Sequence, residues 1–400
     1  MNKNIFLILL FSVALVTSCS RNNPSTEGLP VIDVIRNYPE KEIVLTDIAE
    51  VTYVHFDSKS DDFLYRGSIK YVTKNTIVLE DVSSGSVLFF SKDGAPKSRF
   101  NRYGNGPQEY VGMGNPIVYD EAADEVFINV RSKIQVYSSK GEYKRTLPLP
   151  PGVLIHQMDI FDDQSLIMYN AWNRLYRAQQ KLSENNMDYP THTIDSSFFF
   201  VSKTDGQVLD YIQMSSSQND LSVRTPGGGL IGTTIIDIVK HAEGFLLCTS
   251  EADTVFLYNK NKHLTPVICK IPPVGNMDPK IILISCLDVD QYQFIEAQTM
   301  SYDLMARSDY RDYYKHYIRD KKTGEVYRQR IVMPDYKGKK IIISSGLNNF
   351  YLENGTFIEL DLSELKQAYN KNKLSGKLKE LVATLNEYED NNVFMFVHFK

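Results

Sequence analysis

Short polar turns recur along this chain in two series, and this repetition constrains the fold more than any other feature of the sequence. The first series joins two apolar runs each time and has six members, at residues 74–75, 120–124, 162–163, 241–244, 288–291 and 353–355. In each turn of the second series, an aromatic or β-branched run is followed by lysine and glycine or their polar equivalents. This series has five members, within residues 89–100, 136–147, 200–211, 257–268 and 318–329. Regularly spaced hairpins of this kind predict an all-β architecture made of repeated units.

Six turns of one kind and five of the other predict six four-stranded units, the last of which lacks its outer strand. The β-like stretch at residues 43–56 has no turn partner of its own, and the chain ends on another apolar run at residues 393–399. Pairing of these N- and C-terminal strands would close a ring. We therefore predict a six-bladed β-propeller of four-stranded antiparallel blades. The aromatic composition, 25 Tyr and 20 Phe against one Trp, favours β structure. The absence of WD dipeptides and the single Trp argue against a WD40 propeller.

The N-terminus has the pattern of a lipoprotein signal peptide. Residues 5–16 are apolar apart from Ser12, a run too short to span a bilayer, which needs ~20 residues. Small residues precede Cys19, so we expect lipidation of Cys19 and membrane attachment through its lipid; an ordinary secretory peptide is the alternative. The predicted organisation is a signal peptide at 1–18, a lipidated cysteine and tether at 19–30, and a propeller at 31–400. The predicted location is the outer membrane facing the periplasm, with surface exposure as the other option.

A family resemblance supports this architecture. The segment Arg102 to Tyr110 (RYGNGPQEY) resembles the G-x-G-P-x-E-Y loop of the six-bladed β-propeller lipoproteins of the Bacteroidota, which are similar to NHL-repeat propellers. The C-terminal sequence NNVFMFVHFK resembles the ending of the same family. The resemblance implies the fold and leaves the activity open, because one fold supports many functions.

Propeller geometry predicts that all long connections share one face. Within an antiparallel blade of strands a to d, the a–b and c–d turns lie on one face, and the b–c and d–a connections lie on the other. Every long segment of this sequence is of the second kind, including a helical insertion in blade six at about 362–391 with an apolar stripe of Leu378, Leu381, Val382 and Leu385. Binding sites on rigid β scaffolds usually form on such a loop-rich face.

Two groups on that face are candidate ligand-binding residues. Arg102, Tyr103 and Glu109 belong to the glycine-containing loop, which would bind an anion. Alternatively, the loop is purely structural, with its glycines at positive φ and with Glu109 bonded back to the loop. Trp172, Arg174 and Tyr176 lie in a long b–c insertion and would stack on a sugar or peptide, or else pack that insertion against its blade.

Motifs of common enzyme classes are absent: the sequence has no G-x-S-x-G, H-E-x-x-H, P-loop or catalytic-cysteine signature. His156, Asp159 and Asp237 are candidate channel-lining residues. We predict no cofactor and no metal ligand set, because the inner-strand ends offer a mixed group with one carboxylate, namely Asn115, His156, Thr233, Asp278 and Asn348. The three cysteines after Cys19 lie in apolar runs, which indicates core packing.

These observations favour a lipid-anchored, noncatalytic binding or scaffold module for a glycan, peptide or envelope protein. The alternative is a metal-dependent hydrolase or lyase that uses the central channel. With 44 Lys and Arg against 49 Asp and Glu, a net charge of −5 and no basic block, we predict no nucleic-acid partner.

Overall fold

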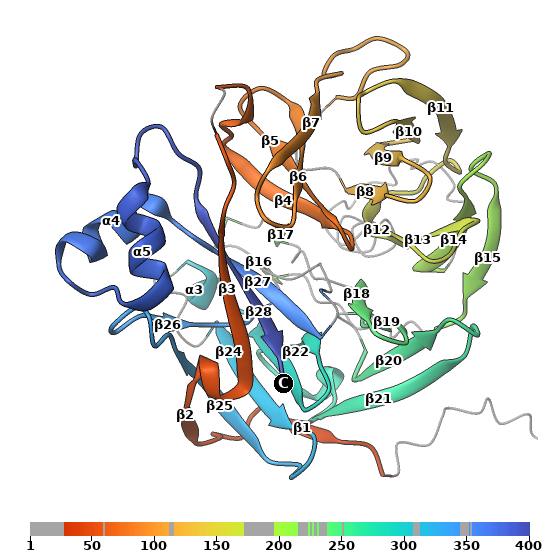
Figure 1. The fold of residues 1–400 in the computed structure, drawn as a ribbon. Helices are drawn as coiled ribbons and strands as arrows, with labels where there is room; N and C mark the ends of the chain where they lie inside the picture. The colour runs from red at the N-terminus through yellow and green to blue at the C-terminus, as the bar shows by residue number, and fades with distance from the viewer. Residues whose placement is uncertain are drawn as a thin grey trace, which may run out of the picture.

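The computed structural model describes most of the chain as one ring of sheets. The described residues are 28–58, 61–111, 116–171, 196–214, 223–224, 226–227, 230–231, 238–249, 252–306, 313–344, 352 and 354–400. Six sheets surround a common axis, with their first strands innermost and their outer strands at the rim (Figure 1). The six-bladed β-propeller predicted from the sequence is confirmed.

Blades 1 to 3 are four-stranded antiparallel sheets joined in simple chain order. Blade 1 contains β4 (Gly67–Val72), β5 (Thr76–Asp81), β6 (Ser86–Ser91) and β7 (Pro96–Phe100). Blade 2 contains β8 (Ile117–Asp120), β9 (Glu125–Val130), β10 (Lys133–Tyr137) and β11 (Tyr143–Pro148). Blade 3 contains β12 (Ile155–Ile160), β13 (Ser165–Asn170), β14 (Phe198–Ser202) and β15 (Val208–Ile212).

Blade 4 carries a fifth strand, and blade 5 carries both a fifth strand and the short β26 (Lys340–Ile341), which pairs with β25 (Val326–Val332); the sequence pattern did not predict these additions. Blade 4 contains β18 (Ile238–His241), β19 (Gly244–Leu247), β20 (Thr254–Asn259) and β21 (Leu264–Ile271), with β1 (Val31–Asp33) parallel to β21. Blade 5 contains β22 (Ile281–Asp288), β23 (Tyr292–Thr299), β24 (Tyr314–Asp320) and β25 (Val326–Val332), with β2 (Glu40–Val44) parallel to β25. The N-terminal segment thus covers two sheet edges that would otherwise present unpaired backbone groups.

Blade 6 closes the ring by joining the two ends of the chain. Its described strands are β27 (Gly355–Leu360), β28 (Val393–Phe399) and β3 (Ala49–His55). β28 and β3 pair antiparallel from Val393 opposite His55 to Phe399 opposite Ala49, and Figure 1 shows them side by side. The predicted pairing of N- and C-terminal strands is therefore confirmed.

The predicted single stretch at residues 43–56 is wrong in one respect, because the chain divides it between two blades. Residues up to Val44 belong to β2 in blade 5, α1 (Leu45–Ile48) follows, and only then does β3 begin in blade 6. Leu45 and Ile48 are both buried. A short helix with two buried side chains lets the chain step from one outer edge to the next without exposing apolar surface.

Helices and minor elements decorate the ring. The insertion predicted at 362–391 forms two helices, α4 (Leu362–Asn370) and α5 (Gly376–Thr384), between β27 and β28. Asp361 caps α4 by accepting a hydrogen bond from Glu364 N at 2.8 Å. The remaining elements are α3 (Tyr302–Met305), the 3₁₀ turns η1 (Asp61–Phe63) and η2 (Val274–Asn276), and the short strands β16 (Val223–Arg224), β17 (Leu230–Ile231) and β26 (Lys340–Ile341).

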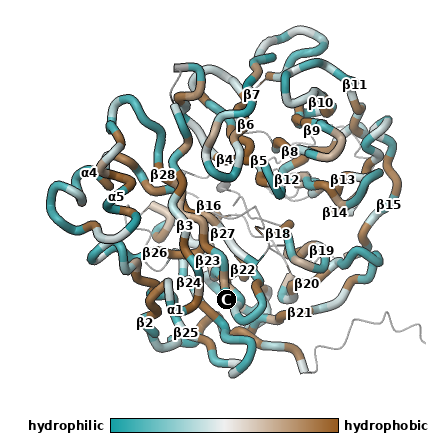
Figure 2. Tube along the Cα trace, viewed as in Figure 1, coloured by the Kyte–Doolittle hydropathy of each residue, from teal (hydrophilic) through white to brown (hydrophobic). Residues whose placement is uncertain are grey.

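Hydrophobic residues occur mainly along the strands, and hydrophilic residues gather at the turns between them (Figure 2). The predicted apolar stripe of the helical insertion packs as expected: Leu378 and Val382 are buried, and Leu381 and Leu385 are partly buried against the cluster formed by blades 5 and 6. Cys248 and Cys286 are buried as predicted, whereas Cys269 is partly exposed. No helix in the described ranges is both long and apolar enough to cross a bilayer.

Candidate functional site

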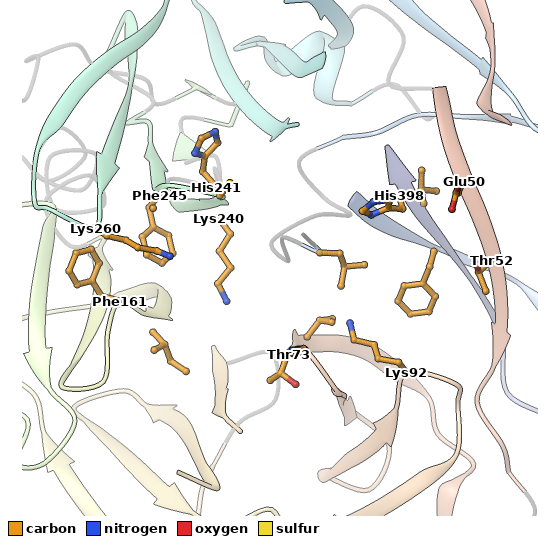
Figure 3. Close-up of a pocket in the computed structure, with 18 residues that line it drawn as sticks. Glu50, Thr52, Thr73, Lys92, Phe161, Lys240, His241, Phe245, Lys260 and His398 are labelled. Carbon is orange, nitrogen blue, oxygen red and sulfur yellow. The ribbon is translucent and has the colours of Figure 1, made fainter. Parts of the chain in front are cut away.

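A cavity of about 760 Å³ opens at the end of the ring where the a–b and c–d turns lie. Blades 1, 3, 4 and 6 contribute its walls, so it spans the mouth of the central channel (Figure 3). The lining residues are Glu50, Thr52, Val72, Thr73, Lys74, Lys92, Ile160, Phe161, Lys240, His241, Ala242, Gly244, Phe245, Lys260, Leu352, Phe396, Val397 and His398. This volume lies within the range of small-molecule sites, ~300–1,000 Å³.

The cavity is locally basic although the protein as a whole is acidic. Four lysines line it (Lys74, Lys92, Lys240 and Lys260), and Glu50 is the one carboxylate among the described lining residues. The complete chain has a net charge of −5. Like charges concentrated in a concavity focus the electrostatic potential and raise the local concentration of counter-ions. The arrangement therefore favours an anion.

Apolar side chains form the walls between these charges. Phe161 and Phe245 lie on the side of blades 3 and 4, and Phe396 belongs to β28 on the opposite side. Phe161 and Phe396 are only partly buried, so each exposes ring surface. A concave surface that is mostly apolar with a few charged groups is typical of small-molecule binding sites.

Three polar side chains from three blades form a network beneath the cavity. Lys240 of β18 donates a hydrogen bond to Tyr71 Oη of β4 at 2.5 Å, and its Nζ lies 3.0 Å from Asp159 Oδ1 of β12. Tyr71 Oη donates to the same Asp159 oxygen at 2.6 Å. Burial, together with the Asp159 carboxylate, raises the pKa of Tyr71 well above its usual value, so the phenol keeps its proton and remains a donor. The charge of Lys240 is thus largely neutralised within the protein.

Lys92 differs from Lys240 because it has no carboxylate partner. It follows β6 in the c–d turn of blade 1, and its side chain is half-buried with Nζ 5.8 Å from the centroid of the Phe396 ring. No ion pair involves it among the described residues. Burial lowers the pKa of Lys92 to about 8, and the negative charge of Glu121 opposes that shift only in part. In Figure 3, Lys92 and Lys240 extend from different sides toward the middle of the cavity.

The loop containing Arg102, Tyr103 and Glu109 lies elsewhere, between blades 1 and 2. Arg102 Nε donates to Gly141 O at 2.9 Å, and Gly106 N donates to Glu109 Oε2 at 2.7 Å. Tyr103 is exposed, and its backbone forms a single β-bridge with that of Tyr110. These contacts are those of a structural loop, and binding of a ligand by its three candidate residues remains a prediction.

The predicted reason for the glycines in this loop is wrong. Neither Gly104 nor Gly106 adopts a positive φ. A Cβ at Gly104 would instead lie 2.0 Å from Glu109 Oε2, and one at Gly106 would lie 2.9 Å from the same atom. The glycines are required because the folded-back carboxylate occupies the space of a side chain.

The structure describes some of the other candidates. Asp159 lies on an innermost strand, as predicted, and belongs to the network under the cavity. His156 lies three residues earlier on the same strand, with its ring 6.5 Å from that of Tyr169. Cys19, Trp172, Arg174, Tyr176 and Asp237 lie outside the described residues, as do Asn115, Thr233 and Asn348 of the mixed strand-end set.

Where the chain is described, no three His, Cys, Asp or Glu side chains gather closely enough to hold a metal ion. Among the described lining residues, the groups that commonly bind divalent cations are the carboxylate of Glu50 and the imidazoles of His241 and His398, and they do not gather into such a cluster.

Sequence reasoning missed the cavity lysines, although a signal for them was present. Lys74, Lys92 and Lys260 occupy the same short turns that indicate the number of blades, and Lys240 directly precedes another. Because all such turns share one face of a propeller, their lysines could have been grouped in advance. The prediction instead placed the binding site among the long connections of the opposite face.

Comparisons with known proteins agree on the architecture. Residues 20–208 match the model of a family described as a 6-bladed beta-propeller, DUF5128. The structure is similar to that of a Bacteroides fragilis protein described as exported, with a TM-score of 0.60 and 14% sequence identity over 92% of this chain and 99% of that one. A DUF4221 family member from Bacteroides vulgatus has a TM-score of 0.48 and 10% identity over 88% of this chain and 97% of that one.

No curated protein matches the chain. The fold and the family match together place the chain among the six-bladed β-propellers, and likenesses at these identities extend to the fold alone.

Proposed function

We propose that this protein is a lipid-anchored, noncatalytic binding module of the cell envelope that holds an anionic ligand in the cavity at the channel mouth. The observation that carries the proposal is the composition of the cavity: four lysines and one carboxylate on walls that are otherwise largely apolar. Such a surface offers charge and shape to a small anion or to the acidic group of a larger glycan, peptide or protein.

The noncatalytic assignment rests on the state of the buried groups. Beneath the cavity, hydrogen bonds and an ion pair join the polar groups of Asp159, Tyr71 and Lys240 to one another. The one lining carboxylate, Glu50, is exposed. A general base needs to be positioned for proton transfer to a ligand, and Asp159 is held instead by Tyr71 and Lys240.

Envelope anchoring rests on the signal-peptide pattern that ends at Cys19. The description of the Bacteroides fragilis structure as an exported protein agrees with it. A second partner on the loop-rich face, where Trp172, Arg174 and Tyr176 occur, remains a prediction from the sequence.

Binding of an anion is tested with a matched pair of fluorescent probes. Anilinonaphthalene sulfonate carries a negative charge, and phenylnaphthylamine has the same aromatic body without it. We expect the purified full-length protein in detergent to bind the sulfonate at least about tenfold more tightly. Equal affinities for the two probes would overturn the assignment of an anionic ligand.

The rim of the cavity provides the variant. Lys74 and Lys260 are exposed, so Lys74→Glu combined with Lys260→Glu should leave folding intact and weaken sulfonate binding, more so at low salt. Lys140→Glu is the matched control, because Lys140 is an exposed turn lysine outside the cavity. A rim variant that binds like the control would argue against this site.

Anchoring is tested separately by Cys19→Ser. We expect this change to move the protein from the membrane fraction to the soluble fraction. Equal membrane association of the variant and the wild type would refute lipidation at Cys19 and leave the cavity assignment untouched.

A further inference from the structure

We infer that the ligand of the cavity is an amphipathic anion whose acidic group pairs with Lys92 and whose apolar body lies against Phe396 and the aromatic wall opposite. This inference rests on the proposed function and adds the chemical class of the ligand and the residue that selects it. The class comprises a carboxylate, sulfonate or phosphate attached to an aromatic or aliphatic body.

Among the lysines that line the cavity, Lys92 is half-buried and has no carboxylate partner within the described part of the chain. An ammonium group that loses hydration without gaining a carboxylate destabilises the folded protein. The same loss of hydration lowers the pKa of Lys92 to about 8. A ligand anion would supply the missing charge and recover the lost free energy.

Glu121, whose negative charge acts on Lys92, cannot take that role, because other partners hold it. Glu121 Oε1 accepts a hydrogen bond from Thr76 Oγ1 at 2.5 Å, and its Oε2 accepts one from Thr73 Oγ1 at 2.8 Å. Lys97 Nζ lies 3.6 Å from the same carboxylate. Glu121 is thus fixed in the a–b turn of blade 2 and reaches Lys92 only through its long-range field.

The other three lysines are less suited to fix an acidic group. Lys240 is committed to Asp159 and Tyr71. Lys74 and Lys260 are exposed, where an ion pair contributes about 0–1 kcal/mol. They would attract an approaching anion, and Lys92 would hold it in the less hydrated interior.

The surroundings of Lys92 explain why the ligand needs an apolar body. Its ammonium group lies beside the Phe396 ring, and Leu352 and Val397 line the same side of the cavity. Phe161, Phe245 and Ile160 face them from blades 3 and 4. A bare inorganic anion would cover little of this apolar surface, whereas an aromatic or aliphatic body would remove it from water at about 25 cal/mol per Å².

The inference is tested by competition against anilinonaphthalene sulfonate. Phenyl phosphate and inorganic phosphate share their acidic group and differ in the apolar body, and phenylacetate replaces phosphate by carboxylate. We expect phenyl phosphate to displace the probe at a concentration at least about tenfold lower than inorganic phosphate. Displacement by phenylacetate would show that the apolar body and one negative charge suffice, and its failure would exclude a carboxylate as the acidic group.

Two substitutions assign the acidic group to Lys92. Lys92→Met keeps the length and apolar stem of the side chain but removes the charge, and it should weaken phenyl phosphate binding by about tenfold or more. Lys92→Arg keeps a cation and should retain most of the affinity. Lys140→Met is the matched control and should bind like the wild type.

The outcomes separate this inference from the proposed function. If inorganic phosphate competes as well as phenyl phosphate, the cavity binds anions and the amphipathic class is wrong. If Lys92→Met binds phenyl phosphate as the wild type does, Lys92 is not the selecting residue. If no anion binds, the proposed function fails and this inference fails with it.

Discussion

Two parts of the molecule, the loop at residues 101–111 and the cavity at the channel mouth, combine charged side chains with aromatic ones. In the loop, Arg102 and Glu109 both bond to backbone groups of the protein. In the cavity, Lys92 lies half-buried beside Phe396 without a carboxylate partner. The loop is the more conspicuous in the sequence, and the cavity is the better candidate for binding.

The difference teaches how to separate structural polar groups from functional ones. A polar group whose hydrogen bonds are made within the protein stabilises the fold, and a ligand would have to displace those bonds. A charged group that loses hydration and gains no partner costs stability, so its retention on a concave surface indicates a ligand. Lys240 and Lys92, which line the same cavity, illustrate the two cases side by side.

The largest expected effect comes from converting the paired lysine into an unpaired one. Asp159→Asn leaves Lys240 without its carboxylate, and the side chain of Lys240 is only 21% exposed. We expect a loss of ~2–3 kcal/mol in the free energy of unfolding. Sulfonate binding should become tighter at the same time, because the charge of Lys240 is released toward the cavity. Denaturant unfolding and a probe titration measure the two effects.

Asp163→Asn, in the exposed a–b turn of the same blade, is the control and should change neither quantity. If Asp159→Asn unfolds at the wild-type denaturant concentration, the distinction between paired and unpaired lysines does not hold.

The pH dependence of binding is the next largest effect. Only protonated Lys92 attracts an anion, and in the free protein the pKa of Lys92 is about 8. Affinity should therefore be constant below pH 8 and fall by up to about tenfold per pH unit above it, until the higher pKa of the bound state is reached. The sulfonate probe keeps its charge throughout, so the change reports the protein.

Other charged groups face Lys92 from neighbouring elements, namely Glu121 of blade 2, Lys74 of blade 1, and Glu50 and His398 of blade 6. These groups are all retained in Lys92→Arg, so that variant isolates the contribution of Lys92. Lys92→Arg removes the titration and should bind equally at pH 7 and pH 9.5. A wild-type protein whose affinity stays flat to pH 9.5 would contradict this account.

A smaller effect is expected in the loop at residues 101–111, where Arg102 and Glu109 bond to backbone groups of the protein. Gly104→Ala places a Cβ where Glu109 Oε2 lies, so the carboxylate must leave Gly106 N. We expect a loss of about 1–2 kcal/mol in the free energy of unfolding, and Glu109→Ala should cost a similar amount. The double variant should cost little more than either change alone, because both remove the same interaction. Strictly additive losses would show that the glycine has another role.

The smallest effect is a gain in stability at the candidate site. Lys92→Met removes a half-buried, uncompensated charge, so the free energy of unfolding at pH 7 should rise by about 0.5–1 kcal/mol. The rise should shrink as the pH increases above about 8 and disappear above about 10.5, where the lysine is neutral in both the folded and the unfolded protein. A loss of stability at pH 7 would make Lys92 a structural residue.

Much of the fold could be predicted from the sequence because its determinants are local. The hairpin turns depend on a few polar residues at each position, and their order along the chain determines the number of blades. The closing strand at residues 393–399 is recognisable because it remains unpaired when the turns are counted. The fifth strands of blades 4 and 5 could not be recognised this way, since Val31–Asp33 and Glu40–Val44 are short and pair with strands more than two hundred residues away.

The sequence by itself determined the class of fold, the closure of the ring and which turns share a face. Only the tertiary structure decided which charges are compensated. Lys92 lies in a short turn and Lys240 directly before one, yet Asp159 and Tyr71 of two other blades contact Lys240, and Phe396 of a third blade contacts Lys92. Compensation of a charge depends on distances of a few ångströms between residues remote in the chain, and no local pattern encodes those distances.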